Sequence, residues 1–278
     1  MRKRHIRTRR DTTTVAFGVL LFGCAGAESV GPARTEDPAV DPAVETPPLR
    51  VLVTGFNDWK ELGVPPALWR CRDNPSCRLL LGDPTTARPT AFAGPLASRL
   101  VAITTAGDRP IQWSFSTLPV TWEVASTEPD YAANDIVVHL GLGVYDRTDV
   151  IYVEDGAYNE RRGADAAGRT VQESIDGEAE GAVLHAPAQS GVAAKVRSLA
   201  GQSFGGITVE VMAARSSNSY LCNETHYYAL QKVHASHAAD GEPTGVQQAF
   251  FVHIPYAVDD DFDALADSVA GVITALVR

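Results

Sequence analysis

From Arg50 onward, short apolar runs alternate with longer segments whose apolar residues recur at helical spacing. The runs predict strands at 51–54, 113–118, 135–140, 207–212 and 249–254, and the longer segments predict helices at 95–103, 192–199, 222–234 and 261–277. This alternation is typical of a parallel sheet covered by helices. No internal repeat interrupts it. We therefore predict one α/β domain, residues 49–278, with a mostly parallel, twisted sheet and helices on both faces.

The first 24 residues have the pattern of a signal peptide. Six basic residues precede position 11, and the apolar run Val15–Gly23 is too short to span a bilayer. Leu21 to Cys24 resembles a bacterial lipobox, so Cys24 could be lipidated, and cleavage after Ala25 or Ala27 is the alternative. A proline- and alanine-rich segment, residues 25–48, then predicts a disordered linker. The chain is expected to be exported to the periplasm or cell envelope, with a lipid anchor as its only membrane contact.

The charge of the chain bears on its partners. Without the six basic residues of the signal segment and Asp11, the 24 basic and 34 acidic side chains become 18 and 33, a net charge of about −15. Such a surface repels phosphate backbones, which argues against nucleic acid as a partner.

The four cysteines have different prospects in an oxidising compartment. Cys71 and Cys77 are close in sequence and could form a disulfide. Cys222 is left without a partner, and an unpaired thiol there is a hazard unless it is buried or useful. Because Cys222 opens a predicted helix, the helix dipole and free amides are expected to favour its thiolate form.

A thiol nucleophile needs a base within hydrogen-bonding reach. His253 is the best candidate, because it is isolated among the apolar residues of a predicted strand. Glu154 follows the apolar run 149–153, and Cys222 begins a helix. All three residues are expected near the carboxyl ends of parallel strands, where reactive groups gather.

Four separated blocks carry a family resemblance. They are Val51–Phe56 with the later Asn74-Pro75-Ser76, Glu154 with Ala157 and Asn159, Tyr220–Asn223 with Tyr227, and Phe251–Tyr256. Together, and in this order, they resemble the pyroglutamyl peptidase I (pyrrolidone-carboxylate peptidase) family of cysteine peptidases. Each block is weak alone, but four in register are fairly specific.

The resemblance implies a single α/β domain that removes an N-terminal pyroglutamyl residue from peptides and needs no cofactor or metal. It assigns the nucleophile to Cys222, the base to His253 and the orienting carboxylate to Glu154. The substrate-binding residues that it implies are Phe56, Trp59, Asn74, Leu142 and Leu221, with Asn74 supplying a polar contact to the lactam. Members of the family often associate, so a homo-oligomer is also implied.

The departures from the family pattern fall mainly in substrate recognition. The loop after Phe56 is altered and lengthened, Leu142 stands where the family has Gln, and Ser217-Asn218 replaces an Ala-Gly pair. They leave two alternatives open: a catalytically silent exported binding protein of the same fold, and an amidase with a different acyl specificity.

Three further patterns favour other chemistry only weakly. Gly201–Gly205 fits G-x-S-x-G, but a predicted helix precedes it and a strand follows, the reverse of a nucleophile elbow. Gly141-Leu142-Gly143 lacks the third glycine of a dinucleotide loop. His226, His234 and His237 complete no recognised zinc spacing and are expected on a solvated helix face.

Overall fold

The computed structural model describes residues 46–57, 59–61, 67–69, 71, 74–82, 91–127, 129–144, 146–177, 181–238 and 243–278, without the side chains of 59–61, 67–69 and 144. The predicted signal peptide, Cys24 and all but the last three residues of the predicted linker lie outside these residues. Among the helices that the structure describes, none is both long enough and apolar enough to cross a membrane.

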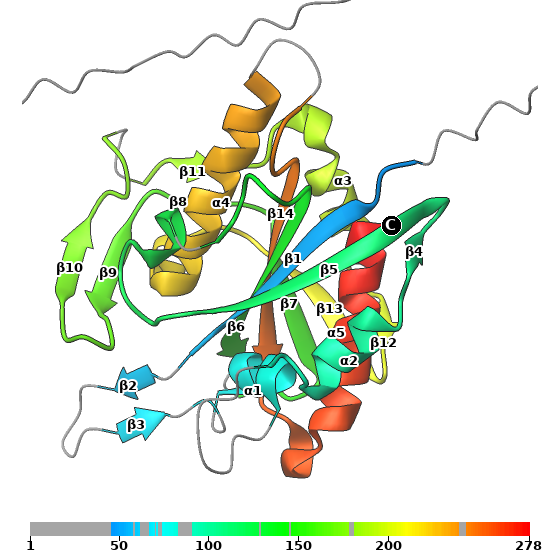
Figure 1. Ribbon diagram of the computed structural model, residues 1–278. Helices are drawn as coiled ribbons and strands as arrows, with labels where there is room; N and C mark the ends of the chain where they lie inside the picture. Colours follow the sequence, from blue (N-terminus) through cyan, green and yellow to red (C-terminus); the bar gives the residue numbers. More distant parts are fainter. Residues whose placement is uncertain are drawn as a thin grey trace, which may run out of the picture. The chain divides into compact units, whose positions relative to one another are not determined.

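One eight-stranded sheet organises the domain (Figure 1), in the order β12-β13-β7-β14-β6-β1-β5-β4. The strands are β1 (Leu49–Phe56), β4 (Thr105–Ala106), β5 (Arg109–Leu118), β6 (Ile136–Val144), β7 (Val150–Glu154), β12 (Ser203–Phe204), β13 (Ile207–Met212) and β14 (Gln248–Pro255). Strands β5, β1, β6 and β14 are parallel to one another, and β13 is parallel to β7. The α/β class and the mostly parallel sheet predicted from the sequence are confirmed.

Strand β7 departs from the expected direction, because it pairs antiparallel with its neighbour β14. The two short outer strands, β4 and β12, are also antiparallel to their partners. The expectation that Glu154 and His253 meet at the carboxyl ends of parallel strands is therefore wrong. Tyr152 is directly opposite His253, and Glu154 lies two residues further along the same face of β7. Such diagonal neighbours are within reach of long side chains.

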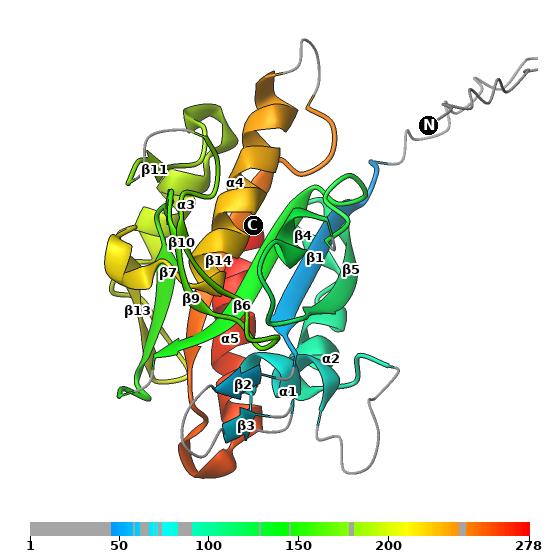
Figure 2. The same cartoon turned by 90° about the vertical axis from the view of Figure 1, so that its left-hand side faces the viewer.

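Helices cover both faces of the sheet (Figures 1 and 2). They are α1 (Pro75–Leu81), α2 (Pro95–Val101), α3 (Val192–Leu199), α4 (Leu221–Ala238) and α5 (Phe262–Val277). Helices α1, α2, α3 and α5 contribute to one large apolar core with one face of the sheet, and α4 packs on the other face. Asp261 caps α5 by accepting a hydrogen bond from the Ala264 amide at 2.9 Å, as its acidic start favours.

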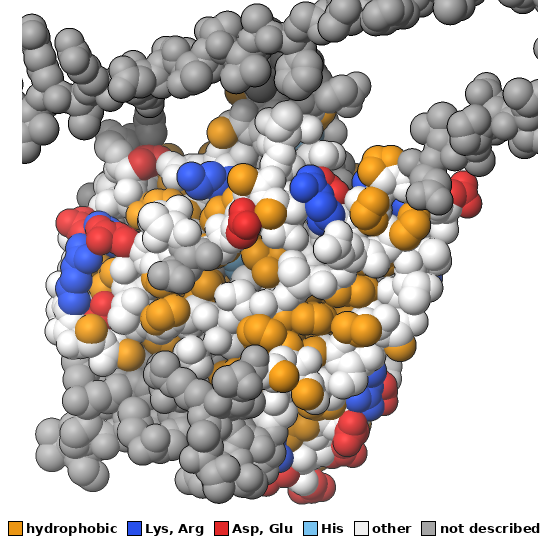
Figure 3. Space-filling view, viewed as in Figure 1, with side chains coloured by type: hydrophobic (Ala, Val, Ile, Leu, Met, Phe, Trp, Pro, Cys, Tyr) orange, Lys and Arg blue, Asp and Glu red, His pale blue; other side chains and the backbone are white. Residues whose placement is uncertain are grey.

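Small elements border the sheet and its helices. They are the pairs β2 (Trp59–Glu61) with β3 (Ala67–Trp69), β8 (Ala157–Tyr158) with β11 (Val183–Leu184) and β9 (Arg161–Ala164) with β10 (Thr170–Glu173), and the short 3-10 turns η2 (Val124–Ser126), η3 (Ala188–Ser190), η4 (Ser216–Asn218) and η5 (Val258–Asp260). Acidic and basic side chains lie next to each other where β9 and β10 are located, at the left of the face in Figure 3. This charged border ties the β9–β10 hairpin to η2 and α4.

Candidate active site

Alternating residues of three neighbouring strands face α4 and form the floor of the site. Gly141 and Gly143 lie on this face of β6, and His253 lies opposite Gly141 on β14. Neither glycine position has room for a methyl group: a Cβ on Gly143 would lie 1.9 Å from His253 Nδ1, and one on Gly141 would lie 2.8 Å from Cys222 Sγ. Gly143 therefore leaves space for the His253 imidazole, and Gly141, two residues earlier on β6, leaves space for the Cys222 thiol.

The nucleophile candidate, Cys222, is the second residue of α4 and is a free thiol. The next two residues of the helix hold it in place. The Asn223 amide donates to the carbonyls of Tyr158 and Glu160 at 2.7 and 2.9 Å. Glu224, which is fully buried, accepts hydrogen bonds from Arg161 and from the Glu123 amide, each at 2.9 Å. The first turn of α4 is thus fixed by two buried polar side chains, Asn223 and Glu224.

Glu154 and His253 are in direct contact. His253 Nε2 lies 2.6 Å from Glu154 Oε1, and the residues are 1% and 2% exposed, respectively. A carboxylate can only accept a hydrogen bond, so Nε2 carries the proton and Nδ1 is free to act as a base. Nδ1 is buried and has no hydrogen-bonding partner among the described residues. It makes no hydrogen bond to the Cys222 thiol in this structure, and catalytic hydrogen bonds often form only when substrate binds.

The charges of these groups follow from their surroundings. Burial alone would raise the pKa of the Glu154 carboxyl, but hydrogen bonds from His226 and His253 outweigh it and lower the pKa to about 2. Burial, reinforced by the Glu154 charge, raises the pKa of the Cys222 thiol well above its ordinary value. Burial of the thiol therefore opposes the thiolate form that the helix N-terminus favours. Cys222 is a thiol that needs a base.

A cavity of about 240 Å³ opens in front of these groups. Its walls are mainly apolar and include Phe56, Leu142 and Leu221, three residues that the sequence predicts to bind substrate. Cys222 and His253 line the same cavity. Trp59 begins β2, and its side chain lies outside the described part of the structure. The remaining predicted binding residue, Asn74, is also in the wall.

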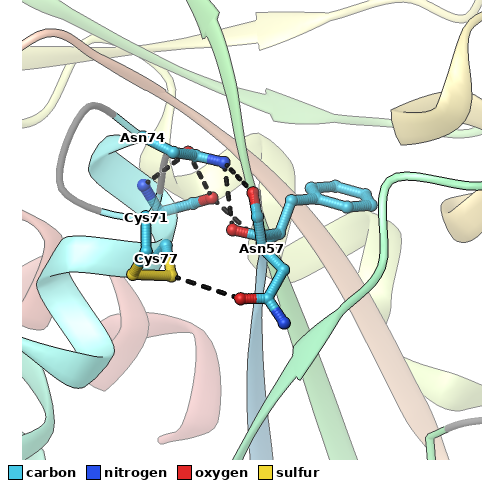
Figure 4. Close-up of a disulfide and its surroundings, with 6 residues drawn as sticks. Asn57, Cys71, Asn74 and Cys77 are labelled. Atoms are coloured by element: carbon cyan, nitrogen blue, oxygen red, sulfur yellow. Dashed lines mark hydrogen bonds between the residues drawn. A yellow bond between two sulfur atoms is a disulfide. The ribbon is translucent and has the colours of Figure 1, made fainter. Parts of the chain in front are cut away.

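The amide of Asn74 is already saturated with hydrogen bonds. Its Nδ2 donates to the carbonyls of Phe56 and Asn57 at 3.0 and 3.1 Å, and its Oδ1 accepts from the amide and hydroxyl of Ser76 at 3.1 and 2.9 Å. Figure 4 shows this arrangement beside the Cys71–Cys77 disulfide, whose sulfurs are 2.01 Å apart. An amide makes at most four such bonds. Asn74 therefore caps α1 and holds β1 in place, instead of offering the free polar contact to substrate that we expected.

Sequence reasoning missed two residues of this site, Asn218 and His226. Asn218 Nδ2 donates to Glu154 Oε1 at 2.7 Å, and His226 Nδ1 lies 2.7 Å from Glu154 Oε2. The expected solvated position of His226 is wrong, since it is 1% exposed, whereas His234 is exposed as expected. The signal was the spacing: His226 follows Cys222 by four residues, which places both on one face of α4.

The other sequence patterns carry no competing site. Ser203 belongs to the short strand β12, which follows α3 and forms a hairpin with β13, so it is not at a nucleophile elbow. Across the described ranges, no group of three His, Cys, Asp or Glu side chains is arranged to hold a metal ion.

Comparisons with known proteins agree on the fold. A mutant pyrrolidone carboxyl peptidase from Pyrococcus furiosus superposes with a TM-score of 0.50 at 20% sequence identity, covering 82% of this chain and 96% of that one. Pyroglutamyl peptidase I from Bacillus amyloliquefaciens superposes with a TM-score of 0.48 at 19% identity, covering 82% and 97%. The chain matches no protein-family model and no curated protein sequence. At this level of identity the likeness concerns the fold alone: the chain has the α/β fold of the pyrrolidone carboxyl peptidases.

Proposed function

We propose that this protein is a cysteine exopeptidase that removes an N-terminal pyroglutamyl residue from peptides. The observation that carries the proposal is the His253–Glu154 contact of 2.6 Å, which leaves Nδ1 without a hydrogen-bonding partner among the described residues, in a ring that lines the same cavity as Cys222. The similarity of the fold and of the four sequence blocks to pyroglutamyl peptidases supports the choice of substrate.

The proposed reaction begins with attack of Cys222 Sγ on the pyroglutamyl carbonyl carbon, as His253 Nδ1 takes the thiol proton. Glu154 stabilises the resulting imidazolium through its bond to Nε2. The tetrahedral intermediate then collapses: the C–N bond breaks, and the departing amine receives the proton from Nδ1. A thioester remains on Cys222. His253 next takes a proton from water, which attacks the thioester; as the C–S bond breaks, His253 returns this proton to the sulfur, and pyroglutamate and the free thiol are released.

A second candidate, an amidase for a different acyl group, is favoured by the saturated amide of Asn74 and the apolar wall around it. A site built to bond a polar substrate rejects analogues that lack the polar group, whereas an apolar site discriminates weakly. Cyclopentanecarbonyl amide is the apolar analogue of a pyroglutamyl amide. Comparing kcat/KM for the two fluorogenic amides tests the substrate directly. A preference for the cyclopentane ring would replace the pyroglutamyl proposal by the amidase.

The decisive experiment measures fluorophore release from the pyroglutamyl amide by the full chain, beside Cys222→Ala and His253→Ala. Turnover by the unaltered protein that both variants lose supports a cysteine peptidase. Absence of turnover on both amides, together with a Cys222 that iodoacetamide does not label, would favour the catalytically silent binding protein.

Action outside the cytoplasm is a further part of the proposal. The Cys71–Cys77 disulfide supports it, because structural disulfides persist in oxidising compartments. Cell fractionation with and without a Cys24→Ser substitution tests export and lipid anchoring together. Size-exclusion chromatography with light scattering tests the proposed homo-oligomer.

A further inference from the structure

Glu154 contacts a second histidine besides the proposed base. His253 Nε2 and Asn218 Nδ2 lie 2.6 and 2.7 Å from Oε1, and His226 Nδ1 lies 2.7 Å from Oε2. Among the described residues, His226 is therefore the only side chain that bonds to the second carboxylate oxygen. The two imidazoles approach one carboxylate from different elements, α4 and β14.

The position of His226 separates it from the substrate. It is 1% exposed and does not line the cavity that contains Cys222 and His253. The centroid of its ring lies 6.1 Å from that of the Phe251 ring, and the Phe251 centroid lies 4.9 Å from that of the His253 ring. An effect of His226 on chemistry must therefore pass through Glu154 or through this packing.

The hydrogen bonds determine which nitrogen of His226 carries a proton. The carboxylate accepts, so Nδ1 must donate. Nε2 is buried and has no hydrogen-bonding partner among the described residues. The bond to Glu154 is thus the one hydrogen bond that this buried ring makes within the described chain. Without it, Oε2 would be a buried, charged atom lacking a donor, and the carboxylate could rotate away from His253.

We propose that His226 is a positioning residue, which holds Oε2 of Glu154 so that Oε1 stays aligned with His253 Nε2 during proton transfer from Cys222. This inference rests on the proposed function for its role in turnover. Its effect on the thiol, however, can be measured without any substrate. The titratable groups near His226 are Cys222 on α4, His139 on β6, Glu154 on β7 and His253 on β14.

The test replaces His226 in the full chain by Phe, which removes the donor, and by Asn, whose amide reproduces Nδ1. His234→Phe is the matched control, since His234 lies on the same helix but is exposed. We expect His226→Phe to lower kcat about tenfold or more with KM little changed; complete loss of the function of a triad carboxylate costs about 10⁴-fold, which sets the upper limit. His226→Asn should restore most of the loss, and His234→Phe should have no effect.

Alkylation of Cys222 by iodoacetamide between pH 5 and 9, followed by mass spectrometry of the peptide that contains Cys222, gives the readout independent of substrate. We expect His226→Phe to slow alkylation and change its pH profile, and His226→Asn to retain the profile. If His226→Phe folds and alkylates like the unaltered protein at every pH, the positioning role is wrong. If the unaltered protein turns over neither amide while alkylation still depends on His226, the proposed function fails and the positioning role stands.

A measurement on the unaltered protein covers the case in which His226→Phe does not fold. Nitrogen-15 NMR of the imidazoles should find His226 protonated at Nδ1 and His253 at Nε2. A His226 ring that is protonated at Nε2 alone would overturn the inference, because Nδ1 could not then donate to Glu154.

Discussion

The two faces of the central sheet are built from the same strands but bury different chemistry. The face towards α5 is apolar: Val138, Leu140 and Val252 belong there to the same apolar core as the helix. On the face towards α4, the intervening positions hold His139, His253 and Glu154, all buried. Apolar burial needs only close packing, whereas each buried polar group must find a partner.

This contrast separates stability from chemistry along a single strand. Leu140 and Gly141 are neighbours on β6, yet one packs in the α5 core and the other lies against the Cys222 thiol. We expect substitutions on the α5 face to change the free energy of unfolding without altering the reaction. Substitutions on the α4 face should change the reaction first.

The largest effect is expected on the α4 face, from Glu154→Gln. A neutral amide does not stabilise the imidazolium that His253 becomes when it takes the thiol proton. We therefore expect kcat to fall by about 10⁴-fold, as in other triads. Turnover of the preferred amide measures it. Glu210→Gln on β13 is the control. It breaks the ion pair between Glu210 and Arg147, whose atoms are 3.0 Å apart, and neither residue lines the cavity. A loss below tenfold in Glu154→Gln would contradict the triad.

The next effect concerns stability in acid and arises from His139, also on the α4 face. Burial, with a smaller contribution from His226, lowers the pKa of His139 from 6.5 to about 3. Below pH 6.5 His139 is protonated in the unfolded chain but stays neutral in the folded chain. The free energy of unfolding is therefore unaffected by His139 above pH 6.5 and decreases as the pH falls towards 3, by up to about 5 kcal/mol.

Urea unfolding at steps from pH 7 to 4 measures this loss. His139→Asn, which does not titrate but keeps an amide near Thr54, should show a shallower decline in unfolding free energy than the unaltered protein. Equal slopes in the two proteins would show that His139 is not the group responsible.

On the α5 face, Leu140→Ala should lower the free energy of unfolding by about 2–5 kcal/mol, because it leaves a cavity in a packed core. Chemical denaturation measures the loss. The pH profile of Cys222 alkylation should remain that of the unaltered protein wherever the variant is folded. A shifted profile would mean that the two faces are coupled, and the contrast between them would not hold.

The smallest effect is expected at the Cys71–Cys77 disulfide, beside the residues that hold Asn74. Replacing Cys71 and Cys77 by Ser opens a short loop of sequence separation 6, which should cost about 2 kcal/mol of stability. Because the disulfide lies beside the Asn74 contacts at the cavity wall, we also expect KM to rise more than kcat falls. Adding a reductant to the unaltered protein should reproduce the change. An unchanged KM would show that the disulfide does not affect substrate binding in the cavity.

Local sequence patterns were sufficient to predict most of the longer helices and strands. The predicted helix 192–199 and strand 207–212 have the same bounds in the structure, because periodicity and capping residues are local properties. Helix α1 and the short strand pairs were missed. They lack long apolar runs, and α1 depends on the Asn74 cap and the disulfide beside it. The pairing of Glu154 with His253 was expected from the family resemblance, but its cross-strand geometry was not.

The sequence by itself determined the fold class and the order of the main strands and helices, since these follow from periodicity, and the family resemblance named the three residues of the proposed triad. Only the tertiary structure decided that β7 runs antiparallel to β14, that Asn74 is saturated and that burial raises the pKa of the Cys222 thiol. It also decided that His226 bonds to Glu154. The physical reason is common to all four: partners and burial depend on residues distant in the chain, and a local pattern does not contain them.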